Sequence, residues 1–181
     1  MKKNSVFISH SIKDHEWANL LYKELEKQGL DIRVDSCDSA SCDELEPETK
    51  EAIEKAAAFM VVIGKKKKNA DRILKETTFA LEVRKKGENN FRVIPLVLEG
   101  VESAILNTFF GREPVGVKIQ IGSGGIDEAI PQILAALGEP LTEEQKRSLI
   151  ASIGATLHKI SPEIREKMKP LGVFQGGGEY F

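Results

Sequence analysis

The segment that most constrains the fold is the uninterrupted apolar run Ala-Phe-Met-Val-Val-Ile at residues 58–63. A strand that is apolar at every position must be buried on both faces, which is the situation of a central strand in a parallel sheet. Strand-like segments alternate with amphipathic helical patterns before and after this run, as in an α/β protein. The sequence therefore predicts a parallel sheet that carries helices on both faces.

Five strand-like segments can be placed along the chain, each followed by a helical pattern. The last of them alternates as expected for a strand at the sheet edge, whereas the apolar run lies in the middle of the pattern. The expected strands are residues 5–8, 30–34, 58–63, 91–98 and 115–121, and the expected helices are residues 12–28, 47–57, 71–86, 104–110 and 126–137.

The first helix has signals at both ends. Ser11 and Asp14 form an S-x-x-D capping signature at its start, and Gly29 is a helix stop. Between these signals the apolar residues recur at helical spacing, so that they share one face. The stripe expected to face the sheet consists of Trp17, Leu20, Leu21 and Leu25.

The five-strand pattern is complete at residue 138, so residues 1–138 are expected to form one domain and residues 139–181 a helical extension. One helix of the extension, opened by a Thr-x-x-Gln capping pair, is expected at residues 142–157, and another at residues 161–169. The extension is either a helical cap on the sheet or the start of a further region of a longer protein. The glycine-rich ending at residues 172–181 favours the second alternative.

Composition excludes several functional classes. Charged residues make up 30% of the chain and the formal net charge is −2, so no basic excess is present to bind nucleic acid or an anionic membrane. No apolar run approaches the roughly 20 residues needed to span a bilayer, and the N-terminus carries no apolar signal region. Cys37 and Cys42 have no partner Cys or His at metal-ligand spacing, so no metal site is expected. We therefore expect a cytoplasmic protein.

Polar residues gather where the strands end. Ser9, His10 and Ser11 follow the first strand, Asp35 follows the second, and Glu76 lies near the start of the helix after the central strand. The carboxyl ends of parallel strands form one edge of the sheet, and ligands of open α/β sheets bind at that edge. The sequence therefore predicts a binding site built from these residues.

Each of these side chains also has a purely structural interpretation. Ser11 caps a helix as readily as it binds a phosphate, and we favour the cap for its side chain. His10 either carries protons at the ligand edge or shapes the loop. Glu76 either acts on a ligand or pairs with Arg72, four residues earlier, on a solvated helix face. The lysines at residues 65–68 either are solvated or reach a phosphate group.

Two stretches together resemble Toll/interleukin-1 receptor (TIR) domains of the bacterial type. The first is Phe7-Ile8-Ser9-His10-Ser11 with an Asp three residues later, which is similar to the opening motif of the family. The second is the position of Glu76 in the first turns of the helix after the central strand. The resemblance covers residues 4–137 and implies a flavodoxin-like open sheet of five parallel strands with helices on both faces.

In enzymatically active TIR domains the Glu that corresponds to Glu76 is catalytic, and the enzyme cleaves NAD+ at the nicotinamide–ribose bond. The resemblance therefore implies that Glu76 is the catalytic residue, with NAD+ as substrate and without a cofactor or metal. It further implies homotypic self-association of TIR domains, and contacts to other domains if the chain is part of a longer protein. The substrate-binding residues expected from it are Ser9, His10, Ser11, Asp35 and Arg72.

The chain departs from the family pattern at two places. Ala70, Arg72 and Ile73 stand where the family usually has a Ser and a Trp-Cys pair. Residues 36–46 correspond to the BB-loop of the family, which gates the ligand site, yet Pro47 is not followed by the usual glycine. Both places border the expected ligand site.

Two functions follow as hypotheses. The first is an NAD+ nucleosidase, a hydrolase or an ADP-ribosyl cyclase, in immune or cell-death signalling such as bacterial defence. The second is a non-catalytic TIR scaffold that acts by homotypic protein–protein interaction, which the missing Trp-Cys pair favours. A phosphoacceptor receiver domain is rejected, because it needs paired acids after the first strand and an Asp after the third, where this chain has Ser9-His10 and Gly64.

Overall fold

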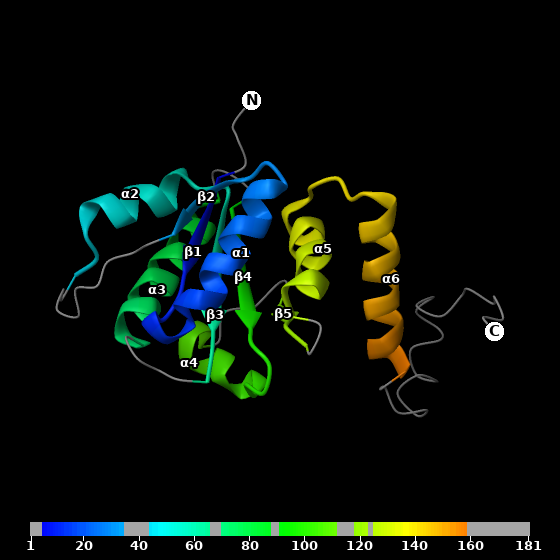
Figure 1. The fold of residues 1–181 in the computed structure, drawn as a ribbon. Helices are drawn as coiled ribbons and strands as arrows, with labels where there is room; N and C mark the ends of the chain where they lie inside the picture. Colours follow the sequence, from blue (N-terminus) through cyan, green and yellow to red (C-terminus); the bar gives the residue numbers. More distant parts are fainter. Residues whose placement is uncertain are drawn as a thin grey trace, which may run out of the picture. The chain divides into compact units, whose positions relative to one another are not determined.

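The computed structural model describes residues 5–34, 44–65, 70–87, 91–111, 118–122 and 125–158 (Figure 1). Within residues 152–158 only the backbone is described. The chain divides into two compact units, Met1–Pro140 and Leu141–Phe181. The first unit holds the sheet and every residue expected at the ligand site.

The first unit is built on a five-stranded parallel sheet, which confirms the predicted fold class. The strand order is β2-β1-β3-β4-β5, so the sequence order reverses between β1 and β3. In open α/β sheets such a switch point opens a crevice at the carboxyl edge, where ligands bind. The strands are β1 (Ser5–Ser9), β2 (Asp31–Val34), β3 (Ala58–Ile63), β4 (Arg92–Val97) and β5 (Ile119–Gln120).

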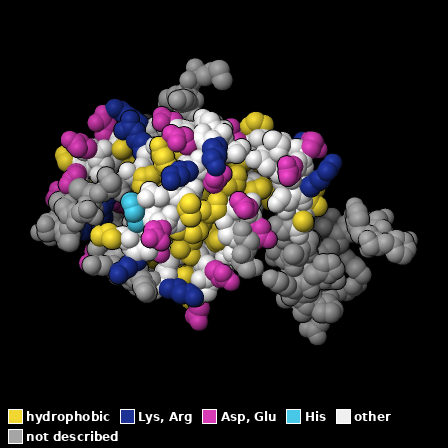
Figure 2. Space-filling view, viewed as in Figure 1, with side chains coloured by type: hydrophobic (Ala, Val, Ile, Leu, Met, Phe, Trp, Pro, Cys, Tyr) yellow, Lys and Arg dark blue, Asp and Glu magenta, His cyan; other side chains and the backbone are white. Residues whose placement is uncertain are grey.

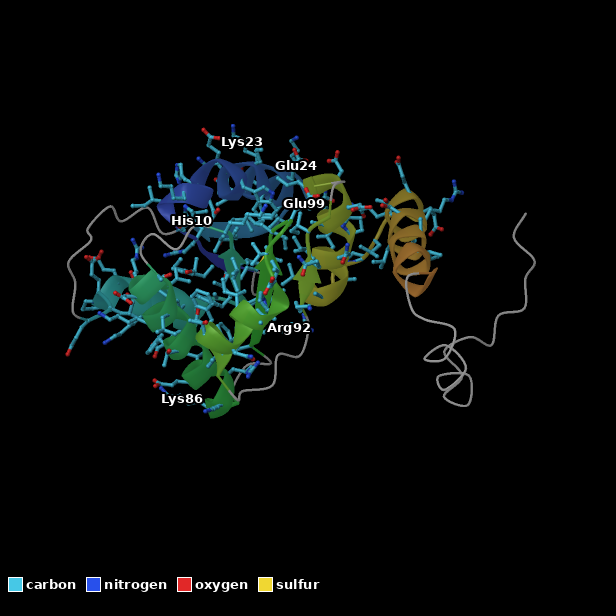
Figure 3. All side chains as sticks on the ribbon, turned by 90° about the horizontal axis from the view of Figure 1, so that it is seen from below. His10, Lys23, Glu24, Lys86, Arg92 and Glu99 are labelled. Atoms are coloured by element: carbon cyan, nitrogen blue, oxygen red, sulfur yellow. The ribbon has the colours of Figure 1, made fainter. Side chains whose placement is uncertain are left out.

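Helices cover both faces of this sheet, as Figure 3 shows in a view with α1 on one side and α3 and α4 on the other. Helices α1 and α5 contact each other, and α3 contacts both α2 and α4. The helices are α1 (His15–Lys27), α2 (Pro47–Lys55), α3 (Ala70–Lys86), α4 (Leu106–Phe110) and α5 (Gly125–Leu137). The helix expected at residues 104–110 is a 3₁₀ turn, Ser103–Ile105, that continues into α4.

The central strand has the burial that its sequence predicts. All six residues of β3 are buried, and alternate ones face opposite layers of helices. On the face that carries α2 and α3, the rings of Phe7 and Phe59 stack with centroids 5.8 Å apart. Burying a side chain of this size contributes about 1.5–3 kcal/mol, so this face anchors β1 firmly against β3.

The first helix begins later than its capping signature predicts. Ser11 caps a 3₁₀ turn, Ile12–Asp14, by accepting a hydrogen bond from the backbone N–H of Lys13, and α1 starts only at His15. The predicted apolar stripe is wrong at Leu20, which is 54% exposed. The buried residues of α1 are Ala18, Leu21 and Leu25.

The second unit contains helix α6 (Glu143–His158). The predicted capping pair is present at its start, where the Thr142 hydroxyl accepts from the Gln145 backbone N–H at 3.2 Å and Gln145 Oε1 accepts from the Thr142 backbone N–H at 2.9 Å. The helix expected at residues 161–169 and the glycine-rich ending lie outside the described residues. In the described part of the chain, none of the helices is long and apolar enough to cross a membrane.

Candidate functional site

Ser9 and Glu76 meet at the carboxyl end of β1, although 67 residues separate them in the sequence. Ser9 is the last residue of β1, and Glu76 lies in the second turn of α3. Helix α3 packs on the face of the sheet to which the Ser9 side chain points. The Ser9 hydroxyl donates to Glu76 Oε2 at 2.5 Å. Both side chains are buried, with Glu76 only 2% exposed. Two of the residues expected at the ligand edge are thus in direct contact.

Arg72 binds the other oxygen of the same carboxylate. It lies one turn before Glu76 on α3, and its Nε donates to Glu76 Oε1 at 2.8 Å. A buried carboxylate is costly unless a cation and hydrogen-bond donors accompany it, and Arg72 and Ser9 supply both. The pairing with Arg72 expected from the sequence is therefore present, but Glu76 lies on a buried helix face rather than a solvated one.

His10 extends from the end of β1 toward α1 (Figure 3). Its Nε2 lies 3.1 Å from Nδ1 of His15, the first residue of α1. On the far side of that ring, His15 Nε2 lies 2.9 Å from the side-chain nitrogen of Asn19. His15 is exposed, so this chain of polar groups reaches solvent, and Figure 2 shows histidine at the protein surface. His15 and Asn19 were not expected at the site, and the i, i+4 spacing between them is the signal that indicates their contact.

The connections that follow β1 and β3 approach each other closely at Asp14 and Gly64. A Cβ atom on Gly64 would lie only 2.2 Å from Asp14 Oδ1, so any side chain there would require the Asp14 carboxylate to move. Asp14 Oδ2 is buried and has no hydrogen-bond partner, and burial raises the pKa of the Asp14 carboxyl above its ordinary value. Asp14 borders a pocket of about 10 Å³ that Ser11 and Ile73 also line. This second carboxyl group at the switch point was absent from the predicted site.

A larger open pocket lies beside this edge, after β3 and β4. It has a volume of about 330 Å³ and is lined by Lys65, Val101, Glu102 and Ile105, together with Gly100. Gly100 has a φ of +72°, which glycine adopts without strain, and the Lys65 ammonium group lies over it. The remaining lysines of the predicted basic loop, residues 66–68, lie outside the described residues.

Of the predicted substrate-binding residues, the structure brings Ser9 and Arg72 onto Glu76, whereas Ser11 caps the turn before α1. Asp35 lies outside the described residues, as do residues 36–43 of the predicted loop with both cysteines. Within the ranges that the structure describes, three or more His, Cys, Asp or Glu side chains nowhere gather in a way that would hold a metal ion.

This arrangement fixes the Glu76 carboxylate through both of its oxygens at the carboxyl edge of the sheet. A carboxylate held in this way can stabilise positive charge that develops on a substrate, because its position is already fixed before the reaction. The Arg72 side chain that binds Oε1 is 24% exposed and therefore borders solvent.

The chain is similar to proteins of known families and structures. The family model described as TIR domain matches residues 6–121, more than half of the chain. No curated protein matches the chain. A structure described as the activated Roq1 resistosome directly recognizing the pathogen effector XopQ (TIR domains) is similar, with 21% sequence identity and a TM-score of 0.49. The similarity covers 57% of this chain and 62% of that one, so the chain spans less than two thirds of the Roq1 chain.

Proposed function

Since the chain belongs to the TIR domain family, we propose that it is an NAD+ nucleosidase that uses Glu76 to cleave the nicotinamide–ribose bond. The activity belongs to immune or cell-death signalling of the bacterial type, and it takes place in the cytoplasm. The products are nicotinamide and ADP-ribose, the latter either free or cyclised.

The observation that carries this proposal is the buried Glu76 carboxylate at the end of β1, held by the Ser9 hydroxyl. Nicotinamide departs as a neutral molecule and leaves positive charge on the ribose, as in the oxocarbenium-like transition states of glycoside cleavage. A fixed carboxylate next to that ribose stabilises this charge. No general acid is needed, because the leaving group takes no proton, so one carboxylate suffices.

Arg72 keeps the carboxylate oriented while the site is empty of substrate. Its guanidinium neutralises Glu76 at 2.8 Å, and the cationic nicotinamide ribose takes over that role when NAD+ binds. The displaced guanidinium is then available to the pyrophosphate of NAD+, which an Arg side chain binds well. Ser9 remains on Oε2 throughout and orients the carboxylate, while His10, Ser11 and Asp35 contact the rest of the substrate.

A non-catalytic TIR scaffold that acts by homotypic contacts is the second candidate. Both Glu76 oxygens are already bonded within the chain and the side chain is 2% exposed, as expected for a carboxylate with a structural task. Arg72 also stands where active family members usually carry the Trp. The two candidates make opposite predictions for catalysis by the assembled protein.

The test is nicotinamide release from NAD+ by concentrated protein, measured for wild type, Glu76→Gln and Glu82→Gln. Glu82 is an exposed Glu on the same helix and serves as the matched control. We expect release by wild type and Glu82→Gln, and a loss of at least about 100-fold in Glu76→Gln, the scale of removing one preorganised charge-stabilising group.

Two other results are informative. Equal release by wild type and Glu76→Gln would place the chemistry elsewhere. No release by folded, self-associated wild type would favour the scaffold.

A further inference from the structure

A hydrogen-bonded chain of three side chains leads from α1 to the end of β1. Asn19 Nδ2 lies 2.9 Å from His15 Nε2, and His15 Nδ1 lies 3.1 Å from His10 Nε2. His10 is one of the proposed substrate contacts, whereas His15 and Asn19 are on the first turns of α1 and have no part in the proposed chemistry.

The two histidine rings meet nitrogen to nitrogen. Their centroids are 5.4 Å apart and the facing nitrogens 3.1 Å, a difference of 2.3 Å. That difference is about twice the distance from the centre of an imidazole ring to one of its atoms, so the two nitrogens lie on the line between the ring centres. The ring planes differ by only 28°. This is the geometry of a straight N–H···N hydrogen bond rather than of two rings stacked face to face.

The Asn19 amide determines which group donates and which accepts in each of these hydrogen bonds. An amide nitrogen only donates hydrogen bonds, so His15 Nε2 must accept and His15 must carry its proton on Nδ1. That proton points at His10 Nε2, which must therefore accept in its turn. The neutral His10 ring then carries its own proton on Nδ1.

We propose that His15 and Asn19 are positioning residues that fix the ring orientation of His10 and hold it as the Nδ1–H tautomer at the carboxyl end of β1. In water a neutral histidine prefers the proton on Nε2, so the hydrogen bonds from His15 and Asn19 select the minor tautomer of His10. Which nitrogen of a histidine is protonated depends on the bond that the other nitrogen makes, and here that bond comes from His15. A second proton on His10, added at Nε2, would face the Nδ1–H of His15, because these two nitrogens lie only 3.1 Å apart.

This arrangement gives His10 the role of an oriented neutral group, not of a positive charge for the phosphates of a substrate. The consequence for catalysis rests on the proposed function, because it requires that His10 contacts NAD+. The tautomer itself does not depend on that function, so the two claims can be tested separately.

The tautomer is tested by long-range ¹H–¹⁵N NMR of the imidazole rings near pH 8, about 1.5 units above the ordinary histidine pKa. The chain has only three histidines, so assignment by single substitutions is practical. We expect His10 and His15 as Nδ1–H tautomers in the wild type, and a return of His10 to Nε2–H in His15→Ala. His15→Asn, whose amide nitrogen can replace the donor at Nδ1, is expected to restore the Nδ1–H form.

Two NMR results would overturn the proposal. One is an Nε2–H tautomer of His10 in the wild type, and the other is an unchanged His10 in His15→Ala. His15 is exposed, so loss of the fold is not expected, and an unchanged amide spectrum of β1 and β3 verifies this.

The catalytic consequence is tested by the kinetics of nicotinamide release. We expect His15→Ala to raise KM about fivefold, the scale of one hydrogen bond, with kcat retained, and His15→Asn to restore KM. A shifted His10 tautomer with an unchanged KM would overturn the contribution of His15 and Asn19 to substrate binding. Release by none of the variants, with the tautomer shift observed, would refute the nucleosidase while upholding the positioning of His10.

Discussion

Two carboxyl groups at the carboxyl edge of the sheet differ in how the fold accommodates them. Glu76 is 2% exposed, yet each of its oxygens accepts a hydrogen bond, one from Ser9 and one from Arg72. Asp14 is only partly buried, yet its Oδ2 is shielded from solvent and has no partner. The more deeply buried group is thus the better satisfied one.

Partners, and not depth alone, therefore decide the cost of a buried charge. Desolvation penalises the charged form, whereas a cation and hydrogen bonds stabilise it. For Asp14 desolvation is the cause that raises its pKa. Glu76 has Arg72 at 2.8 Å to oppose the same penalty. Removing a partner of Glu76 should therefore cost more stability than changing the surroundings of Asp14.

The largest effect on stability is expected from Arg72→Ala. This change leaves the buried Glu76 carboxylate without its cation, and removal of one member of a buried ion pair costs about 3 kcal/mol. The measurement is urea unfolding at pH 7 beside Lys86→Ala, a change of an exposed cation at the end of the same helix, which should cost less than about 0.5 kcal/mol. Equal midpoints for the two variants would show that Glu76 does not depend on Arg72.

The second prediction concerns Ser9→Ala, which removes the other hydrogen bond to the carboxylate. A hydrogen bond to a charged group contributes about 1.5–3 kcal/mol, so we expect a loss of about 2 kcal/mol in urea unfolding. Ser5→Ala is the matched control on the same strand, because the Ser5 hydroxyl bonds only an exposed carbonyl, that of Lys55. A loss as small as that of the control would mean that Arg72 alone satisfies Glu76.

Much of this fold and part of the site follow from local sequence patterns. The limits of β3 are predicted to the residue, because an apolar run of that length has no alternative to burial on both faces. Ser9 and Glu76 are predicted at one edge, because parallel strands place all their carboxyl ends together. The pairing of Arg72 with Glu76 follows from helical spacing.

The remainder depends on packing between segments far apart in the sequence. The S-x-x-D signature fits both a helix and the 3₁₀ turn that forms, so it does not locate the start of α1 at His15. The burial of the Arg72–Glu76 face depends on how α3 packs against β1. The contact of Asp14 with Gly64 joins two loops some 50 residues apart, and no periodic pattern links them.

Gly64→Ala tests that contact and is the third prediction. The new methyl group would meet Asp14 Oδ1 at 2.2 Å, and because the carboxylate is the end of a partly exposed side chain, it can move aside. We expect a loss of about 1–2 kcal/mol in thermal unfolding, the lower range for overpacking. The same change in an Asp14→Ala background should cost much less, since the obstructing group is gone. An equal loss in both backgrounds would assign the cost to the β3 backbone and not to Asp14.

The smallest effect is expected from the titration of Asp14 itself. Because burial raises the pKa of Asp14 in the folded protein, the protonated form is the favoured one in that state, and its contribution to stability is complete below the ordinary Asp pKa of about 3.9. This contribution is lost as the pH rises through the folded pKa. The melting temperature of Asp14→Asn, which does not titrate, should therefore rise relative to wild type between about pH 4 and about pH 7. A difference that shrinks over this range would mean that Asp14 is stabilised in its charged form, as Glu76 is by Arg72, and the contrast between the two carboxyl groups would disappear.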